Sequence, residues 1–376
     1  MGEIIEFDNK RLQNFFKEFL RVVSLTSSDL EEIPGCVELT YDDDGDEISQ
    51  HDIDILLKYI KVTRFSKYNF TNIVFKGNGT NKISFTECTF NECTFKDVIV
   101  LTQVDEDFSR YGNSKIEVEI NNLKQLHDIC KFNNNNICYS FKIENDMNKQ
   151  VPIMQSYSME EIKKIDNIFQ MIQSIVPSNI SNLDKLLIVS TLLCKNLVID
   201  DRGDTDSEEY NRLSEKEKNI YRSLVVTFKG SLLMGIAVCV QYAVCLKWAL
   251  EAVGINSRTV CSSNHMWNQI DLNGDGTWYN FCLTNLRDFF KNYKKFYPAL
   301  FLTCNKTISE LGNSYILLME GNDCILNYEY DIRKIINKIQ TINGILNKEM
   351  PLRWETLDPE SKTRINSSLE EFLEEI

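Results

Sequence analysis

The apolar residues in the second half of the chain recur at helical spacing. In 159–176 they lie three or four positions apart and stop before Pro177, and they are Ile162, Ile165, Ile168, Phe169, Ile172 and Val176. This spacing places one apolar stripe on a helix that proline ends. The segment 183–197 has the same character, with Ser181 before it as a candidate N-cap residue. Two more amphipathic segments in 313–376 predict a helical C-terminal tail.

The first half of the chain has a different period. Pairs of apolar or small residues, two positions apart, recur every five residues, and they are Tyr68 and Phe70, Ile73 and Phe75, Asn78 and Thr80, Ile83 and Phe85, Cys88 and Phe90, Cys93 and Phe95, and Val98 and Val100. A period of five fits neither an α-helix nor a flat strand. The pattern at 65–100 resembles pentapeptide-repeat proteins, and this resemblance implies a four-sided right-handed β-helix of about two coils.

An ordinary run of short alternating strands is the alternative for the same residues, and KISFTECTF (82–90) fits it well. Both alternatives predict that the N-terminal region, 1–150, is rich in β-structure. Stacked coils or strands of this kind carry no chemistry of their own and offer an interaction surface.

A β-hairpin is predicted at 265–284. Its two alternating segments, 265–272 and 277–284, flank the turn Asn-Gly-Asp-Gly. Alternation places His265, Trp267 and Gln269 on one face of the first strand, and Trp278, Asn280, Cys282 and Thr284 on one face of the second.

Cys239 lies where a loop containing Gly235 passes into a predicted helix that ends near Gly254. A thiol at a helix N-terminus meets the positive end of the dipole, which lowers its pKa and favours the thiolate. The unpaired N–H groups there can also hold an oxyanion. Gln241, two residues further, is expected to be a surface amide. A thiol on a helix start, a histidine on one strand and a polar group on the next are the arrangement of a Cys–His–X triad.

The block around these residues resembles the transglutaminase-like superfamily, bacterial branch, which is related in fold to papain-like cysteine proteases. The matching motifs, in order, are Gly235, Val238-Cys239, Tyr242-Ala243, Gly254-Ile255, His265-Met266-Trp267-Asn268 and Trp278-Tyr279, and the likeness covers 181–310. The resemblance implies an α+β fold in which the helix carrying Cys239 packs on an antiparallel sheet. It places a transglutaminase-like domain at 156–312, with Cys239 as nucleophile and His265 as base.

The sequence departs from the family pattern at Cys282, which stands where the family has its triad Asp. That carboxylate normally sets the imidazole tautomer, and its loss can lower the rate by about 10⁴. Three alternatives remain for this site: Asn280 orients His265, Cys282 ionises, or the site has lost catalysis and kept its shape. Two further hypotheses are Zn²⁺ bound by Cys239, His265 and Cys282, and a disulfide between the two thiols.

The amino-acid composition limits the kinds of partner that the chain is expected to bind. Acidic residues outnumber basic ones by 55 to 41, which gives a net charge of −14 and argues against a nucleic-acid-binding surface. No apolar run approaches the roughly 18 residues that cross a bilayer, so we expect no membrane partner. The chain has 12 cysteines, no CxxC pair and no secretory signal at its start. We therefore expect a cytoplasmic protein with reduced thiols and no cofactor.

Two classes of function follow. The first is a cysteine-dependent acyl-transfer enzyme, such as a peptidase, an amidase or a protein cross-linking enzyme, that acts on protein or peptide amides. The second is a catalytically weakened transglutaminase-like module that binds protein. Retention of Cys239 and His265 favours the first class, and the replacement at Cys282 favours the second.

Overall fold

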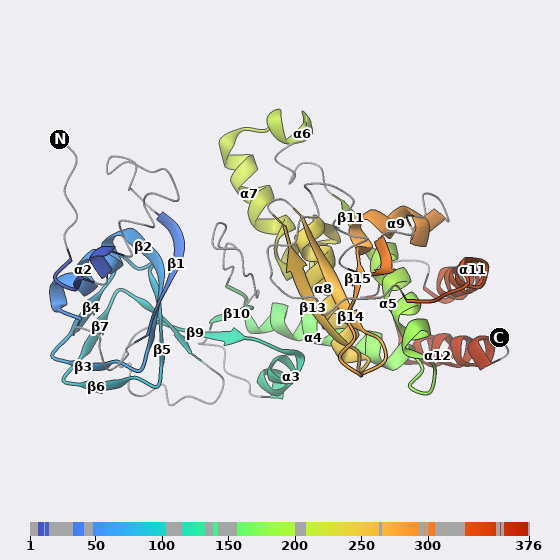
Figure 1. The fold of residues 1–376 in the computed structure, drawn as a ribbon, viewed down its shortest axis with the longest axis horizontal. Coiled ribbons are helices and arrows are strands. Elements are labelled where there is room, and N and C mark those ends of the chain that lie inside the picture. Colours follow the sequence, from blue (N-terminus) through green and yellow to red (C-terminus); the bar gives the residue numbers. More distant parts are fainter. Residues whose placement is uncertain are drawn as a thin grey trace. The chain divides into compact units, whose positions relative to one another are not determined.

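The computed structural model describes residues 7–10, 12–14, 33–40, 48–102, 115–131, 138–141, 156–199, 208–262, 265–292, 297, 300–304, 328–350, 354 and 357–374. Helices and strands are mixed along the chain, as expected for an α+β protein (Figure 1). The chain forms two compact units. Unit 1 comprises Met1–Asn121, Lys131–Lys142 and Met147–Met159, and unit 2 comprises Asn122–Cys130, Ile143–Asp146 and Glu160–Ile376.

Unit 1 is built on a parallel sheet with the order β1-β2-β5-β8-β9-β10. Its strands are β1 (Ile33–Thr40), β2 (Ile60–Ser66), β5 (Lys82–Thr86), β8 (Ile99–Thr102), β9 (Lys115–Ile120) and β10 (Cys138–Phe141). Two smaller parallel pairs are β3 (Asn69–Thr71) with β6 (Thr89–Asn91), and β4 (Val74–Lys76) with β7 (Thr94–Lys96). Helix α2 (Gln50–Tyr59) leads into β2, and Ser49 caps it in a capping box with Asp52.

The strands from Ile60 to Thr102 form a coil with three strand-bearing sides. Stacked residues in the first turn are 20 positions apart, as in Val62 and Lys82, and in the next turn they are 17 apart, as in Lys82 and Ile99. Five residues link β4 to β5, but only two link β7 to β8. The first turn has the 20 residues that four five-residue sides require, whereas the second turn is three residues shorter, and strands lie on three sides of both.

Phenylalanine rings fill the inside of this coil. Phe65 stacks on Phe85, Phe70 on Phe90 and Phe75 on Phe95, with centroid distances of 5.6, 5.8 and 5.0 Å. Neighbouring sides meet edge to face, as in Phe70 and Phe75 at 5.2 Å. The five-residue spacing supplies one inward ring per side, so stacking of the turns produces three ladders of rings.

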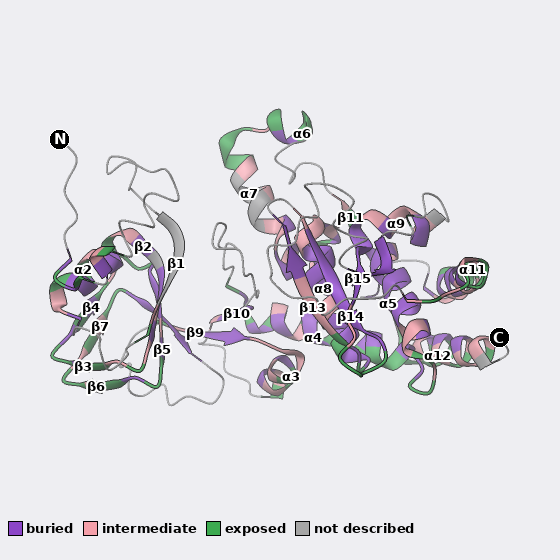
Figure 2. Cartoon of the chain, in the orientation of Figure 1, coloured by how far each residue is buried: buried purple, intermediate pink, exposed green. Residues whose placement is uncertain are grey.

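Unit 2 contains an antiparallel sheet with the order β13-β14-β15-β16, and helix α8 packs against β13 and β14 (Figures 1 and 2). The strands are β13 (Asn256–Cys261), β14 (Met266–Asp271), β15 (Tyr279–Phe281) and β16 (Phe301–Thr303). The helices that carry or surround this core are α3 (Leu123–Lys131), α4 (Met159–Ile175), α5 (Asn182–Asn196), α6 (Glu208–Asn211), α7 (Glu215–Val225), α8 (Cys239–Ala252) and α9 (Leu283–Asn292). Buried side chains concentrate in α5, α8, β14 and β15, whereas most of α6 and the first turn of α7 (residues 215–217) are exposed (Figure 2).

The predicted hairpin is present but its second strand is shorter than expected. Asn268 pairs with Phe281 and Ile270 with Tyr279, and three backbone N–H groups of the turn donate to the Asp271 carboxylate. The strand ends at Phe281, and Thr284 lies in α9 instead of on a strand face. Leu286, Phe289 and Phe290 are buried. Burial of these three residues on one side of a helix explains the change from strand to helix.

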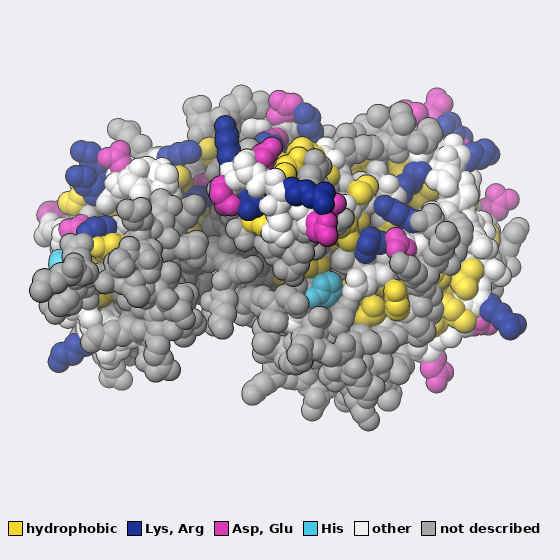
Figure 3. Space-filling view, turned by 90° about the horizontal axis from the view of Figure 1, so that it is seen from above, with side chains coloured by type: hydrophobic (Ala, Val, Ile, Leu, Met, Phe, Trp, Pro, Cys, Tyr) yellow, Lys and Arg dark blue, Asp and Glu magenta, His cyan; other side chains and the backbone are white. Residues whose placement is uncertain are grey.

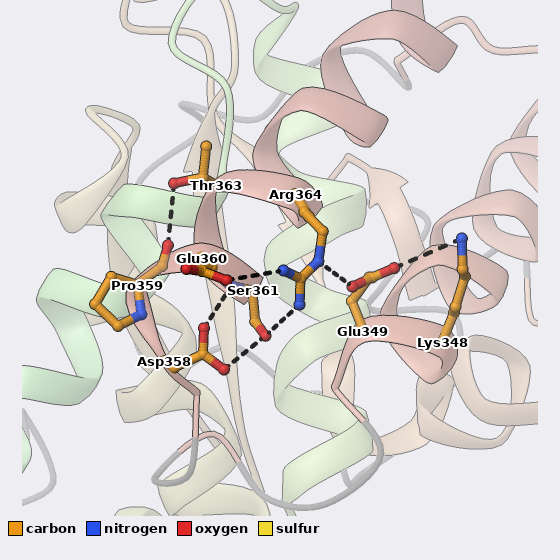
Figure 4. Close-up of polar contacts among 8 residues, drawn as sticks. All are labelled: Lys348, Glu349, Asp358, Pro359, Glu360, Ser361, Thr363 and Arg364. Carbon is orange, nitrogen blue, oxygen red and sulfur yellow. Dashed lines mark hydrogen bonds and ion pairs between the residues drawn. The ribbon is translucent and has the colours of Figure 1, made fainter.

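The C-terminal helices α11 (Ile332–Glu349) and α12 (Pro359–Glu374) are joined by polar contacts of Arg364 (Figure 4). Its Nε donates to Glu349 Oε2 at 2.8 Å, and its Nη2 donates to Ser361 Oγ at 2.9 Å. Asp358 accepts the backbone N–H of Ser361 at 2.8 Å and so caps α12.

Candidate active site

Cys239 is the first residue of α8, and an unusual backbone leads into it. The chain passes through a π-helix, η3 (Lys229–Met234), and turns at Gly235, whose φ of 77° lies in the left-handed region. It then runs through the short strand β12 (Ile236–Ala237), which pairs with β11 (Val198–Ile199). The N-cap residue Val238 makes no side-chain cap hydrogen bond, and Cys239 lies at the N-terminal end of α8, where the helix dipole is positive.

His265 lies directly before β14, and the β14–β15 pairing brings it to Cys282. Its Nε2 is 3.1 Å from Cys282 Sγ. The backbone of His265 is held by Ser262, whose N–H donates to His265 O at 2.8 Å and whose Oγ accepts His265 N–H at 3.1 Å. The ring of Trp267 lies nearly parallel to the imidazole, at 17° and a centroid distance of 6.1 Å. Cys282 is therefore the residue in contact with the Nε2 edge of this imidazole.

Burial controls the charge state of this imidazole. Burial lowers the pKa of His265 from 6.5 to about 4, because desolvation disfavours the imidazolium. Cys282 is itself fully buried. A buried anion beside the ring would oppose this effect, and a neutral thiol does so only weakly. Burial by itself therefore favours the neutral imidazole, and a negative charge beside the ring is needed to stabilise the imidazolium.

Asn280 makes polar contacts with neighbouring strands of the sheet. Its Oδ1 accepts hydrogen bonds from Trp267 Nε1 at 2.9 Å and from Gln269 Nε2 at 3.2 Å. Its Nδ2 donates to Thr303 O at 3.2 Å. Both lone pairs of the amide oxygen are therefore used, and Asn280 fixes the indole of Trp267 across the sheet.

Asn268 joins the helix that carries Cys239 to the strand that follows His265. Its Nδ2 donates to Ala243 O at 2.9 Å, while its Oδ1 is buried without a hydrogen-bond partner. Tyr242 Oη donates to Leu197 O at 2.9 Å and anchors α8 on its other side. These contacts set the position of α8 relative to both β14 and the end of α5.

A polar group behind Cys239 was missed by the sequence reasoning. Gln241 is 1% exposed, so the expectation of a surface amide is wrong. Its Oε1 accepts from Ser231 Oγ at 3.1 Å, and Cys245 Sγ donates to the same hydroxyl at 3.2 Å. The group ties η3 to α8. The sequence contains no signal for it, because the contact depends on the π-helix.

The structure also bears on the zinc site and the disulfide that the sequence left as alternatives. Among the described residues, no group of three or more His, Cys, Asp or Glu side chains is placed to hold a metal ion. Cys239 and Cys282 are both described, and both are thiols that form no disulfide. The zinc site and the disulfide predicted as alternatives are therefore absent from this part of the chain.

Two observations concern possible partners, namely the charge on the surface and the apolar character of the helices. On the face drawn in Figure 3, Lys and Arg side chains are interspersed with Asp and Glu side chains. None of the described helices combines the length and the apolar character needed to cross a bilayer.

Comparison with solved structures finds a chain described as "Crystal structure of a TGase". The two sequences are 13% identical, the match covers 54% of this chain and 78% of that chain, and the TM-score is 0.27. No protein-family model matches the chain, and no curated protein matches it.

Proposed function

We propose that this chain is a cysteine-dependent acyl-transfer enzyme of the transglutaminase-like kind, acting on protein or peptide amides. One observation carries the proposal, namely the 3.1 Å contact between His265 Nε2 and Cys282 Sγ. It leaves Nδ1 as the imidazole nitrogen that serves the nucleophile. Cys239, at the start of α8, is that nucleophile, and the N–H groups beside it form the oxyanion site.

The proposed reaction has two steps. The Cys239 sulfur attacks the amide carbon, and His265 accepts the thiol proton. A C–S bond forms, the C–N bond breaks, and His265 passes the proton to the departing amine. Water or a second amine then attacks the thioester carbon, so a C–O or C–N bond forms and the C–S bond breaks. The proton of the attacking group returns through His265 to the Cys239 sulfur.

Cys282 decides how well His265 performs this task. A carboxylate only accepts hydrogen bonds, so it holds the proton on Nε2 and leaves Nδ1 basic. A thiol can accept or donate. When Cys282 S–H donates to Nε2, the ring proton sits on Nδ1 and the base is blocked. A Cys282 thiolate would act like the carboxylate.

A protein-binding module with weakened catalysis is the second candidate. It is favoured by the same substitution together with the burial that lowers the pKa of His265 to about 4. An imidazole that resists protonation cannot form the thiolate–imidazolium pair that such enzymes use.

The deciding test is alkylation of the native protein with iodoacetamide at pH 6, followed site by site with mass spectrometry. An ordinary thiol is less than about 1% ionised at this pH. The proposal expects fast labelling of Cys239 that is lost in His265→Ala. Cys93 and Cys138, which are half-buried, serve as internal references. Cys245, whose pKa burial raises to about 12, should stay unlabelled. Labelling of Cys239 at the rate of the references would favour the binding module.

A further inference from the structure

Three large apolar side chains are exposed among the described residues of unit 2, and two of them adjoin the segment that leads to Cys239. Val198 exposes 55% of its surface, Met234 47% and Tyr297 46%. Val198 pairs with Ile236 across β11 and β12, and its N–H donates to Gly235 O at 2.8 Å. Met234 directly precedes Gly235. The half-exposed Ile236 completes this set, which we call the apolar wall (Val198, Met234 and Ile236).

The wall lies within reach of a peptide bound at Cys239. Ile236 is three residues before Cys239, and three extended residues span at most about 10 Å. Val198 is one strand spacing further, about 4.8 Å. A substrate held at the thiol therefore reaches the wall with a side chain within about four residues of the reacting amide.

The backbone behind the wall is held firmly. Leu197, next to Val198, accepts hydrogen bonds from Tyr242 Oη at 2.9 Å and from Lys291 Nζ at 3.0 Å. Gly230 packs so closely on the preceding helix that a Cβ there would lie 2.0 Å from Leu224 O. A fixed apolar surface needs little ordering when a ligand covers it, which favours binding.

Charge identifies the ligand chemistry. Residues 230–240 contain no charged side chain, in a chain where 26% of residues are charged. A charged ligand group at the wall would lose hydration and meet no counter-ion from this segment, whereas an aliphatic group gains from burial.

From this placement we infer that the apolar wall is a substrate subsite that binds a large aliphatic side chain, such as leucine, of the peptide attacked by Cys239. The inference rests on the proposed function and adds the substrate class to it.

Tripeptide chloromethyl ketones test it, because the Cys239 sulfur displaces chloride and the adduct is read by mass spectrometry. Leucine is moved through the three peptide positions and compared with serine at each. Each rate is divided by the iodoacetamide rate of the same variant, so that a change in thiol reactivity cancels. We expect leucine to exceed serine by about tenfold or more at one position. Val198→Ser combined with Met234→Ser should reduce that ratio below about threefold. The matched control Val74→Ser, at a valine of unit 1 that is 42% exposed, should keep the wild-type ratio.

The outcomes separate the two proposals. Selective iodoacetamide labelling of Cys239 with equal leucine and serine rates at every position overturns the subsite and leaves the proposed function standing. A leucine preference that survives the double substitution also overturns it, since the preference then arises elsewhere. Failure of selective iodoacetamide labelling overturns the proposed function and the subsite together.

Discussion

A thiol and a carboxylate differ in what they offer to an imidazole. Cys282 can donate to His265 Nε2 or accept from it across 3.1 Å, whereas an Asp at this position would only accept. We expect Cys282→Asp to increase the rate of a Cys239-dependent reaction by ten-fold to about 10⁴-fold, because it fixes the productive tautomer. The rate of Cys239 alkylation at pH 6 and the rate of hydrolysis of a peptide amide both measure this increase. Cys282→Ser is the matched control, since a hydroxyl also donates or accepts and should give no gain.

The low pKa of His265 links folding to pH. Burial lowers it from 6.5 to about 4. Between pH 6.5 and pH 4, His265 is therefore protonated in the unfolded chain but not in the native state. Stability is therefore full above about pH 6.5 and falls as the pH drops toward 4, by about 1–2 kcal/mol at pH 5. Urea unfolding followed by tryptophan fluorescence at pH 7.5 and pH 5 measures the loss. In His265→Gln the loss should shrink by that amount, and an unchanged loss in this variant would contradict the prediction.

At the scale of elements, the π-helix η3 is hydrogen-bonded to α8, the helix that begins at Cys239. Gly230 approaches Leu224 O so closely that Gly230→Ala must move the backbone. We expect a loss of about 2–4 kcal/mol of stability and slower alkylation of Cys239. Gly344→Ala is the control, since no atom lies within 4 Å of the added Cβ, and removal of a helical glycine should stabilise by about 0.5–1 kcal/mol. Thermal unfolding of both variants measures these changes in stability. Equal melting temperatures of the two variants would contradict the prediction.

The elements that the sequence predicted are those set by local pattern. The helix at 159–176 and the hairpin after His265 appear because apolar spacing and the turn residues specify them directly. The contact of His265 with Cys282 follows from the same alternation. The π-helix was not predictable, since it depends on the approach of Gly230 to another helix. The shorter second turn of the coil was not predictable, because it depends on how many residues link β7 to β8.

At the scale of the whole molecule, the two units give separate optical signals. All four tryptophans, Trp248, Trp267, Trp278 and Trp354, belong to unit 2, whereas the phenylalanine ladders belong to unit 1. Phe75 is fully buried, so Phe75→Ala should cost about 3–5 kcal/mol in unit 1. The unfolding transition seen by circular dichroism should broaden toward lower denaturant, while the tryptophan transition stays in place.

Val74→Ala is the control for this variant, because Val74 is the exposed neighbour of Phe75 and its truncation should change stability by less than about 0.5 kcal/mol. A shift of the tryptophan transition in Phe75→Ala would show instead that the two units unfold as one.

The two turns of the coil differ in length at one corner. The turns differ by three residues. The whole difference lies in one link, because five residues connect β4 to β5 and only two connect β7 to β8. One residue added inside a strand would turn the following residues of that strand to the opposite face. We therefore expect the coil to accept a change of length in the link after β4 more readily than inside its strands.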